Sequence, residues 1–270
     1  MLRLSAGAAA GMALPAIGLL ACSEETVAPL DPDDSDTNGV DPSTDPTLLP
    51  IPELLVASTF NLEMRPGTRE FQSDLTTATK GYNGDFLGPT LVFRTGVDVS
   101  LNVTNNIGVS TTTHWHGMHL PAVMDGGPHQ PIDPGAMWAA GFPVLNRAST
   151  YWYHPHHHAP TGQGVIFDPT STGYQVYEGL AGMIIVEDDV SDALPLPRAY
   201  GVGDIPLILQ DRRFQSNGEL LHFPADFNPA SDPALRKGGH FLVNGVEAAV
   251  LEVGAQVVRL RILNASNARI

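Results

Sequence analysis

The sequence is poor in cysteine and in positive charge, and each shortage excludes a class of protein. Cys22 is the only cysteine among 270 residues, which excludes a disulfide framework and a zinc knuckle built from several cysteines. Lys and Arg number 14 against 29 Asp and Glu, and the net charge of −15 makes nucleic acid an unsuitable partner. No stretch carries a long 3.6-residue hydrophobic period, so a helical bundle is not expected.

What is abundant instead indicates β-structure. The chain has 27 Gly and 23 Pro, its residues are 43% hydrophobic, and Val, Ile and Thr are spread along its length. This composition is typical of many short strands joined by turns. The sequence therefore predicts an all-β fold, and 270 residues allow one large domain or two small ones.

The first 22 residues have the features of an export signal. Arg3 is the only charge, and an apolar run follows that ends in Leu19-Leu20-Ala21-Cys22. Such a segment is too short for a well-anchored membrane span. Its end resembles the lipobox of bacterial lipoproteins, which implies a cell-envelope or periplasmic protein anchored by lipid on Cys22. An ordinary signal peptide with an incidental Cys22 is the alternative, and "LRLSAGAAAG" also resembles the tail of a twin-arginine signal.

Residues 23–50 form an acidic segment with few large apolar side chains. Between Cys22 and Pro50 there are eight acidic residues and no Lys or Arg. Such a segment buries too little surface to fold, so we expect a disordered linker that holds the folded part away from a membrane. A membrane contact is expected only through the lipid.

From about residue 51 the pattern is that of strands. In residues 97–106, Val97, Val99, Leu101 and Val103 alternate with polar side chains, as in a half-buried strand. Residues 180–188, "LAGMIIVED", are an apolar run typical of a core strand. Further strands are expected at 205–214 and at 256–266, where Val258, Leu260 and Ile262 alternate with Arg259 and Arg261.

Seven of the ten histidines lie in two short stretches, "THWHGMHL" (113–120) and "YWYHPHHHAP" (151–160). Residues i and i+2 of a strand point to the same face, so His114 would project with His116, and His154 with His156. Four imidazoles in one small volume suit Cu, Zn, Fe or Ni. All-nitrogen ligation in an exported β-protein favours copper first and zinc second. We expect His157 and His158 outside the first ligand shell, and His119, His129, His222 and His240 as polar or supporting residues.

Several blocks together resemble the multicopper oxidase family over roughly residues 51–270. The first domain of that family is similar to "YNGDFLGPTLVFRTGVDVSLNVTNN", "THWHGMHLPAVMDGGPHQPIDPGAMW" and "STYWYHPHHHAPTGQGV…YEGLAGMIIVEDD". The early part of the second domain is similar to "HFLVNGVEAAVLEVGAQVVRLRILNASNAR". The resemblance implies a cupredoxin-like Greek-key β-sandwich, with a first domain at 51–190 and the start of a second at 198–270.

The resemblance also implies roles for individual residues. His114 would bind the type 2 copper of a trinuclear cluster, and His116, His154 and His156 would bind the type 3 pair. Asp125 matches an acidic residue that assists proton delivery to dioxygen; its alternative role is that of a turn residue before Gly126-Gly127. The implied partners are dioxygen and a small reducing substrate, a phenol or a metal ion.

One departure from the family limits what this chain does alone. The closing H-C-H motif with the mononuclear-copper cysteine is absent. We therefore expect the N-terminal portion of a longer protein, which supplies half of the cluster histidines and is inactive alone. Copper-efflux oxidases, bacterial laccases and a copper-free cell-division relative share this layout. Because the copper-free relative has largely lost the cluster histidines, the four retained here favour an oxidase. The alternative is a non-enzymatic copper-binding or envelope interaction protein.

Overall fold

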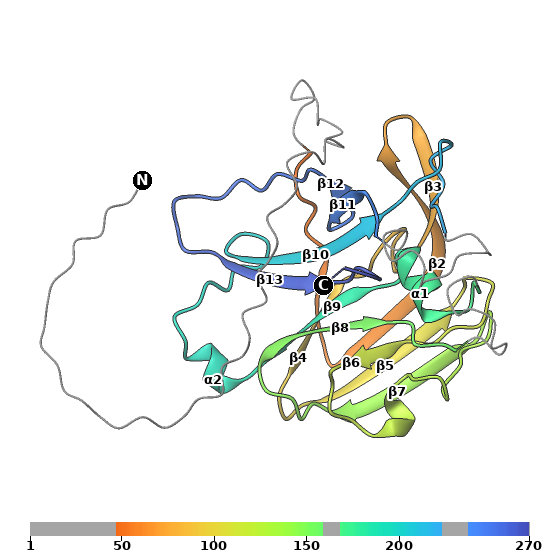
Figure 1. The fold of residues 1–270 in the computed structure, drawn as a ribbon. Helices are drawn as coiled ribbons and strands as arrows, with labels where there is room; N and C mark the ends of the chain where they lie inside the picture. The colour runs from red at the N-terminus through yellow and green to blue at the C-terminus, as the bar shows by residue number, and fades with distance from the viewer. Residues whose placement is uncertain (1–46, 159–167, 223–236, 270) are drawn as a thin grey trace, which may run out of the picture. The chain divides into compact units, whose positions relative to one another are not determined.

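The computed structural model describes residues 47–158, 168–222 and 237–269, and strands dominate them (Figure 1). The strands in chain order are β1 (Leu54–Val56), β2 (Thr59–Gln72), β3 (Leu75–Tyr82), β4 (Thr90–Arg94), β5 (Asp98–Asn105), β6 (His114–His116), β7 (Met137–Pro143), β8 (Ser149–His154), β9 (Gly182–Glu187), β10 (Asp204–Arg212), β11 (His240–Val243), β12 (Val246–Glu247) and β13 (Arg259–Asn264). The short helices are α1 (Thr172–Tyr177) and α2 (Asp189–Asp192), with a 3-10 turn η1 (Ala122–Met124). The expected signal segment and most of the acidic linker lie outside the described residues.

The first part of the described chain is a β-sandwich. One sheet has the order β1-β4-β9-β8-β6 and the other the order β3-β2-β5-β7. Strand β2 pairs in parallel with β5, and β4 with β9, so the chain crosses between sheets as in a Greek-key sandwich. The core between the sheets includes Phe60, Leu101, Trp115, Tyr153 and Ile184. The expectation of an all-β sandwich is confirmed.

Strand β5 shows how the hydrophobic alternation positions the core. Val99, Leu101 and Val103 are buried, and each fully buried side chain of this size stabilises the fold by roughly 1.5–3 kcal/mol. Val97, expected on the same face, is 41% exposed. It lies before the strand, in a turn after Gly96 in which its N–H donates to the carbonyl of Arg94, so the strand periodicity does not yet apply.

Strand β9 is buried on both faces, as its continuous apolar run predicts. Ile184 and Val186 belong to the sandwich core, whereas Met183 and Ile185 pack in a second cluster with Ile208 of β10. The second cluster joins the sandwich to a further sheet, of order β12-β11-β10-β13. The two faces of β9 thus pack in two different hydrophobic clusters.

Strand β13 alternates, but its charged side chain is the buried one. Leu260 and Ile262 are 49% and 60% exposed, while Arg261 is buried. The guanidinium of Arg261 donates two hydrogen bonds of 2.7 Å to the carboxylate of Asp204 on the parallel neighbour β10. A buried charge requires such a partner, and the partner decides which face turns inward.

Ordered contacts begin before the expected domain start at residue 51. The N–H of Leu49 donates to the carbonyl of Val250, and the side-chain amide of Asn244 donates to the carbonyl of Pro50. Among the described residues, no helix has both the length and the apolarity to cross a bilayer. The division into domains at 51–190 and 198–270 stays a prediction.

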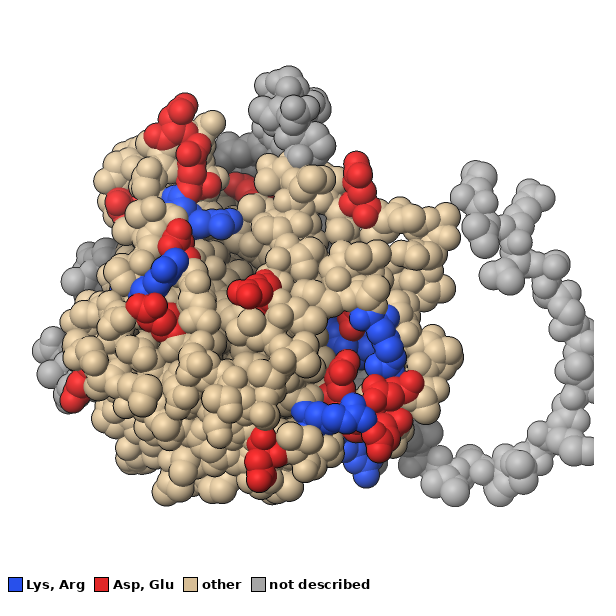
Figure 2. All heavy atoms as spheres, turned by 180° about the vertical axis from the view of Figure 1, so that it is seen from behind, with Lys and Arg blue, Asp and Glu red and all other residues tan. Residues whose placement is uncertain are grey.

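Charged side chains on the face turned away in Figure 1 are mixed in sign. Figure 2 shows basic and acidic atoms gathered together there, with most of the remaining surface uncharged. Ion pairs of the described residues also mix the two signs, since Arg94 contacts Asp189 and Asp192, and Arg198 also contacts Asp192. This face therefore presents no continuous basic surface.

Candidate metal centre

The candidate centre is built on the pairing of β6 with β8. Strand register places His114 opposite His154 and His116 opposite Trp152. Side chains directly opposite each other in an antiparallel pair lie on one face at close range. The two H-x-H motifs are therefore brought together by a cross-strand contact between segments about forty residues apart.

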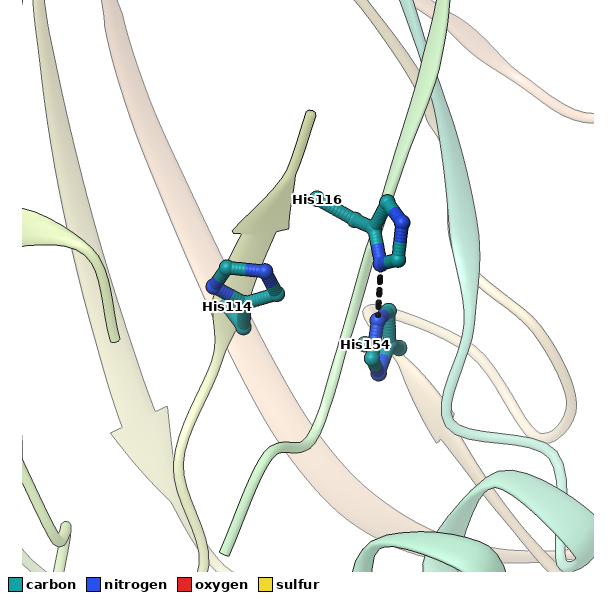
Figure 3. A group of neighbouring side chains, drawn as sticks. All are labelled: His114, His116 and His154. Atoms are coloured by element: carbon teal, nitrogen blue, oxygen red, sulfur yellow. Dashed lines mark hydrogen bonds between the residues drawn. The ribbon is translucent and has the colours of Figure 1, made fainter. Parts of the chain in front are cut away.

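Three histidines direct ring nitrogens at one small volume. Ligand atoms of His114, His116 and His154 all lie within 4.8 Å of one another. Figure 3 shows the ring of His116 facing that of His154, with His114 beside them on β6. The Nδ1 of His116 and the Nε2 of His154 are 3.1 Å apart. Two nitrogens bound to one ion at about 2.0–2.1 Å also lie roughly 3 Å apart.

Backbone carbonyls determine which nitrogen of each ring is free. The Nδ1 of His114 donates to the carbonyl of Asp125 at 2.9 Å, and the Nδ1 of His154 donates to the carbonyl of Pro155 at 2.7 Å. A neutral imidazole carries one proton, so both Nε2 atoms keep a lone pair. The proton between His116 and His154 therefore lies on the Nδ1 of His116. Binding of a metal at that nitrogen would require the neutral ring to carry its proton on Nε2 instead.

The surroundings favour the neutral form of two of these rings, His154 and His116. Burial lowers the pKa of His154 to about 3, against an opposing contribution from its bond to Pro155, and the other histidines lower it further. Burial first, and then His114 and His156, also lower the pKa of His116. Neutral imidazole is the metal-binding form, so the lowered pKa of each of these two rings favours metal binding at neutral pH.

His156 lies close to this group but is not a member of it. Its ring centroid is 5.0 Å from that of His114, and its Nδ1 is buried without a hydrogen-bond partner among the described residues. An unsatisfied buried nitrogen is costly unless a ligand completes it. Its backbone N–H donates to the hydroxyl of Thr112 at 2.7 Å, a contact that no sequence pattern indicates.

Both the main-chain carbonyl and the side-chain carboxylate of Asp125 lie close to the ring of His114. Besides the carbonyl bond, a carboxylate oxygen is 3.3 Å from the Nδ1 of His114, and the side chain is 38% exposed. The next residue, Gly126, has a φ of 68°, and a Cβ there would lie 1.7 Å from the carbonyl oxygen of Thr113. Only glycine fits this turn, and Asp125 directly precedes it. The role expected for Asp125, proton relay or turn residue, stays a prediction.

The remaining histidines lie elsewhere. The Nδ1 of His157 donates to the carbonyl of Thr170, and His158 is exposed and stacks against His156. His222 stacks on Tyr174, and His240 contacts Glu247. His119 and His129 are exposed. None of these belongs to the three-histidine group of the described residues.

The donor set fits a metal that accepts imidazole nitrogen. The three convergent nitrogens of His114, His116 and His154 suit copper, and so does the unpaired Nδ1 of His156. The same three nitrogens also suit zinc. Geometry alone does not choose between these two metals.

Comparison with known proteins decides the family. A family model described as multicopper oxidase matches residues 63–191. The chain is 37% identical over 226 residues to cell division protein FtsP of Photorhabdus laumondii, and 37% identical over 210 residues to multicopper oxidase mco of Staphylococcus aureus. The chain belongs to the multicopper oxidase family.

Solved structures of multicopper oxidases share the fold. A bacterial laccase-like multi-copper oxidase CueO from Ochrobactrum sp. superposes with a TM-score of 0.71 at 36% identity, over 82% of this chain and 47% of that one. The McoA multicopper oxidase of Aquifex aeolicus gives 0.70 at 34% identity, over 84% of this chain and 47% of that one. The cupredoxin-like fold expected from the sequence is confirmed.

This multicopper oxidase chain spans less than half the length of the curated relatives it matches. The match covers 83% of this chain but 44% of the FtsP protein, and 78% of this chain but 43% of the mco protein. The relatives include proteins named as cell division proteins as well as proteins named as multicopper oxidases.

Proposed function

We propose that His114, His116, His154 and His156 form half of the histidine shell of a trinuclear copper cluster. The whole protein would take single electrons from a small reducing substrate, a phenol or a metal ion, and reduce dioxygen to water. The observation that carries the proposal is the convergence of three ring nitrogens within 4.8 Å. Copper bound there would supply the one-electron redox chemistry that no side chain offers.

The chain's own residues hold the ligands in place. The carbonyls of Asp125 and Pro155 orient the rings of His114 and His154, and β6–β8 pairing sets their separation. In this proposal His114 serves the type 2 copper, while His116, His154 and His156 serve the type 3 pair. The ligand atoms of His114, His116 and His154 converge within 4.8 Å, a spacing that suits binding to copper ions of one cluster.

Asp125 is proposed as the proton relay. Reduction of one dioxygen to two waters consumes four protons, which must reach a partly buried site from solvent. The carboxylate of Asp125 is 38% exposed and lies 3.3 Å from the Nδ1 of His114. A carboxylate that contacts both solvent and the site can accept and pass a proton at its oxygens.

The other half of the cluster and the electron-entry copper would come from outside these residues. The chain has a single cysteine, Cys22, in its proposed export signal, and it matches less than half of its relatives' length. We propose that further chain or another subunit supplies the missing ligands. Residues 23–270 alone would show no intense visible copper–thiolate band and no oxidase activity.

The second candidate is a non-enzymatic envelope protein, and the relatives named cell division protein FtsP favour it. The retained histidines support the oxidase, because a protein that acts through contacts alone needs no convergent ring nitrogens.

Histidine variants test the copper site. His116→Ala and His156→Ala should each lower the copper bound by the folded chain, because each removes a nitrogen donor. The matched control is His240→Ala, on β11, which should leave copper content unchanged. Bound copper is measured by elemental analysis after dialysis against a competing chelator. Unchanged copper in both variants, with folding retained, would contradict the assignment.

Export and lipid attachment are proposed from the Leu19-Leu20-Ala21-Cys22 end of the signal segment. Lipid chains contribute about 0.8 kcal/mol per buried methylene to membrane binding. The protein should therefore fractionate with membranes, and Cys22→Ala should release or misprocess it. Mass spectrometry of residue 22 checks the lipid, and a wild-type protein found only in the soluble fraction without lipid would count against it.

A further inference from the structure

The strand ladder does not reach His156. Strand β8 ends at His154, and the next residue, Pro155, has no N–H to continue the pairing. The Nδ1 of His156 also has no partner among the described residues, so its ring orientation depends on how the main chain is held. At His156 itself, the main-chain N–H donates to the hydroxyl of Thr112 at 2.7 Å.

A buried amide on α1 holds the segment that carries this hydroxyl. Gln175 is fully buried, and its Oε1 accepts a 2.5 Å hydrogen bond from the hydroxyl of Thr111. Its Nε2 donates to the carbonyls of Ser110 and Pro169, at 3.1 and 3.0 Å. One side chain thus ties the segment before β6 to the segment before α1, and its bond to Thr111 is buried, where a hydrogen bond is stronger than in water.

Helix α1 makes a second connection to the same histidine segment. Both the N–H and the hydroxyl of Thr172 donate to the carbonyl of His157, at 3.3 and 3.1 Å. The Nδ1 of His157 donates in return to the carbonyl of Thr170. His156 is therefore held from one side through Thr112 and from the other through its neighbour His157, and both routes meet at Gln175.

We propose that Gln175 is a positioning residue of the metal centre, which sets the place of His156 relative to β6 through Thr111, Thr112 and helix α1. The inference rests on the proposed copper site. Gln175 touches no candidate ligand itself. Supporting contacts of this kind matter because a metal tolerates little displacement of its donors. Another buried amide, Asn244, also makes three backbone bonds, but to Ile208, Pro50 and Pro206, none of which leads to the histidines.

This difference supplies the experiment. Gln175→Met removes all three bonds at similar size and without charge, and Asn244→Gly removes three bonds at a position whose φ of 50° suits glycine. We expect Gln175→Met to weaken Cu(II) binding about 10- to 100-fold, the usual range for supporting contacts, and to alter the Cu(II) EPR hyperfine splitting. Asn244→Gly should lower the unfolding temperature but keep the wild-type affinity and spectrum. Affinity is measured by chelator competition on the folded chain.

Each outcome decides a separate question. A folded Gln175→Met variant with wild-type affinity and spectrum overturns the inference, as does an equal loss of affinity in Asn244→Gly. If Gln175→Met does not fold, Thr112→Val decides, since it removes only the hydroxyl that accepts from His156; unchanged affinity and spectrum there also overturn it. A folded wild-type chain that binds no copper refutes the proposed function, and this inference with it.

Discussion

At the scale of single residues, the centre depends on backbone carbonyls as much as on side chains. The Nδ1 atoms of His114 and His154 donate to the carbonyls of Asp125 and Pro155, respectively. The Nε2 atom of each ring is then the nitrogen that can bind a metal. The carbonyl of Asp125 also accepts the N–H of Trp115, so the turn that carries it is tied to β6 twice. Displacing that turn would rotate His114 without altering any ligand atom.

Two glycines with similar backbone angles test this dependence. Gly126 and Gly135 have φ of 68° and 78°, but only at Gly126 would a Cβ meet another atom, the carbonyl oxygen of Thr113. Gly135→Ala should cost about 1–2 kcal/mol from the left-handed backbone alone. Gly126→Ala should cost clearly more and should also weaken copper binding, because the turn must move. Urea unfolding and chelator competition measure both quantities; equal effects of the two substitutions would contradict the argument.

At the scale of elements, helix α1 is held by side chains from the sandwich and from the segment that follows β10. The ring of His222, which follows β10, stacks on Tyr174 of α1 with centroids 3.8 Å apart. Lys80 on β3 forms an ion pair with Glu178 at the end of α1, and its Nζ lies 5.9 Å from the centre of the Tyr174 ring. Helix α1 is therefore packed between a histidine and a cation on different elements.

The stacked histidine makes a prediction about pH. Burial lowers the pKa of His222 to about 4, with further lowering by Lys80 and Arg212. Between about pH 4 and the ordinary value of 6.5, the unfolded chain binds this proton and the folded chain does not. The contribution of His222 to stability is therefore complete above pH 6.5 and is lost as pH falls towards 4.

Substitution by a residue that does not titrate should remove this contribution. His222→Phe keeps an aromatic ring against Tyr174, so the free energy of unfolding of the variant relative to wild type should rise as pH falls from 7.5 to 4.5. The difference is measured by denaturant unfolding at several pH values. A difference that is constant over this range would show that His222 takes up its proton equally in both states.

At the scale of the whole molecule, a buried ion pair of the second sheet, between β10 and β13, also contacts the sandwich. Arg261 of β13 pairs with Asp204 of β10 and also donates to the hydroxyl of Thr150 on β8, at 3.2 Å. The hydroxyl of Tyr200 bridges the same joint, with bonds to the hydroxyl of Thr90 and the carbonyl of Pro52. The second sheet is thus bound to the sandwich by satisfied polar groups around the apolar cluster of Ile208 and Met183.

Breaking one partner of this pair should be costly, while replacing both should not. Asp204→Asn leaves the guanidinium of Arg261 buried beside a neutral amide and should destabilise the protein by about 3–5 kcal/mol. Asp204→Leu combined with Arg261→Met should cost less, because both members of the fully buried pair are replaced. Arg259, whose guanidinium is 3.7 Å from Asp204, keeps 24% of its side chain exposed. Arg94→Ala, in an exposed ion-pair cluster, should leave the unfolding transition unchanged. Thermal and denaturant unfolding give the comparison; an unaffected Asp204→Asn variant would contradict it.

The sequence by itself determined the features that follow from local period and residue type. The alternation of Val99, Leu101 and Val103 gave the inner face of β5, and the H-x-H spacing put His114 and His116 on one face of β6, because strand side chains repeat every two residues. The same expectation fails for His154 and His156, because β8 ends at His154. The family motifs then identified the sandwich, which the comparisons confirmed.

Only the tertiary structure decided the features that depend on a partner from far along the chain. Arg261 is inside and Ile262 outside because Asp204 lies on the next strand. Likewise Thr112 and Gln175 carry no motif, and their contacts to the histidine segment exist only once α1 packs beside it. Local spacing specifies which way a side chain can point, whereas the groups that it meets are set by chain folding.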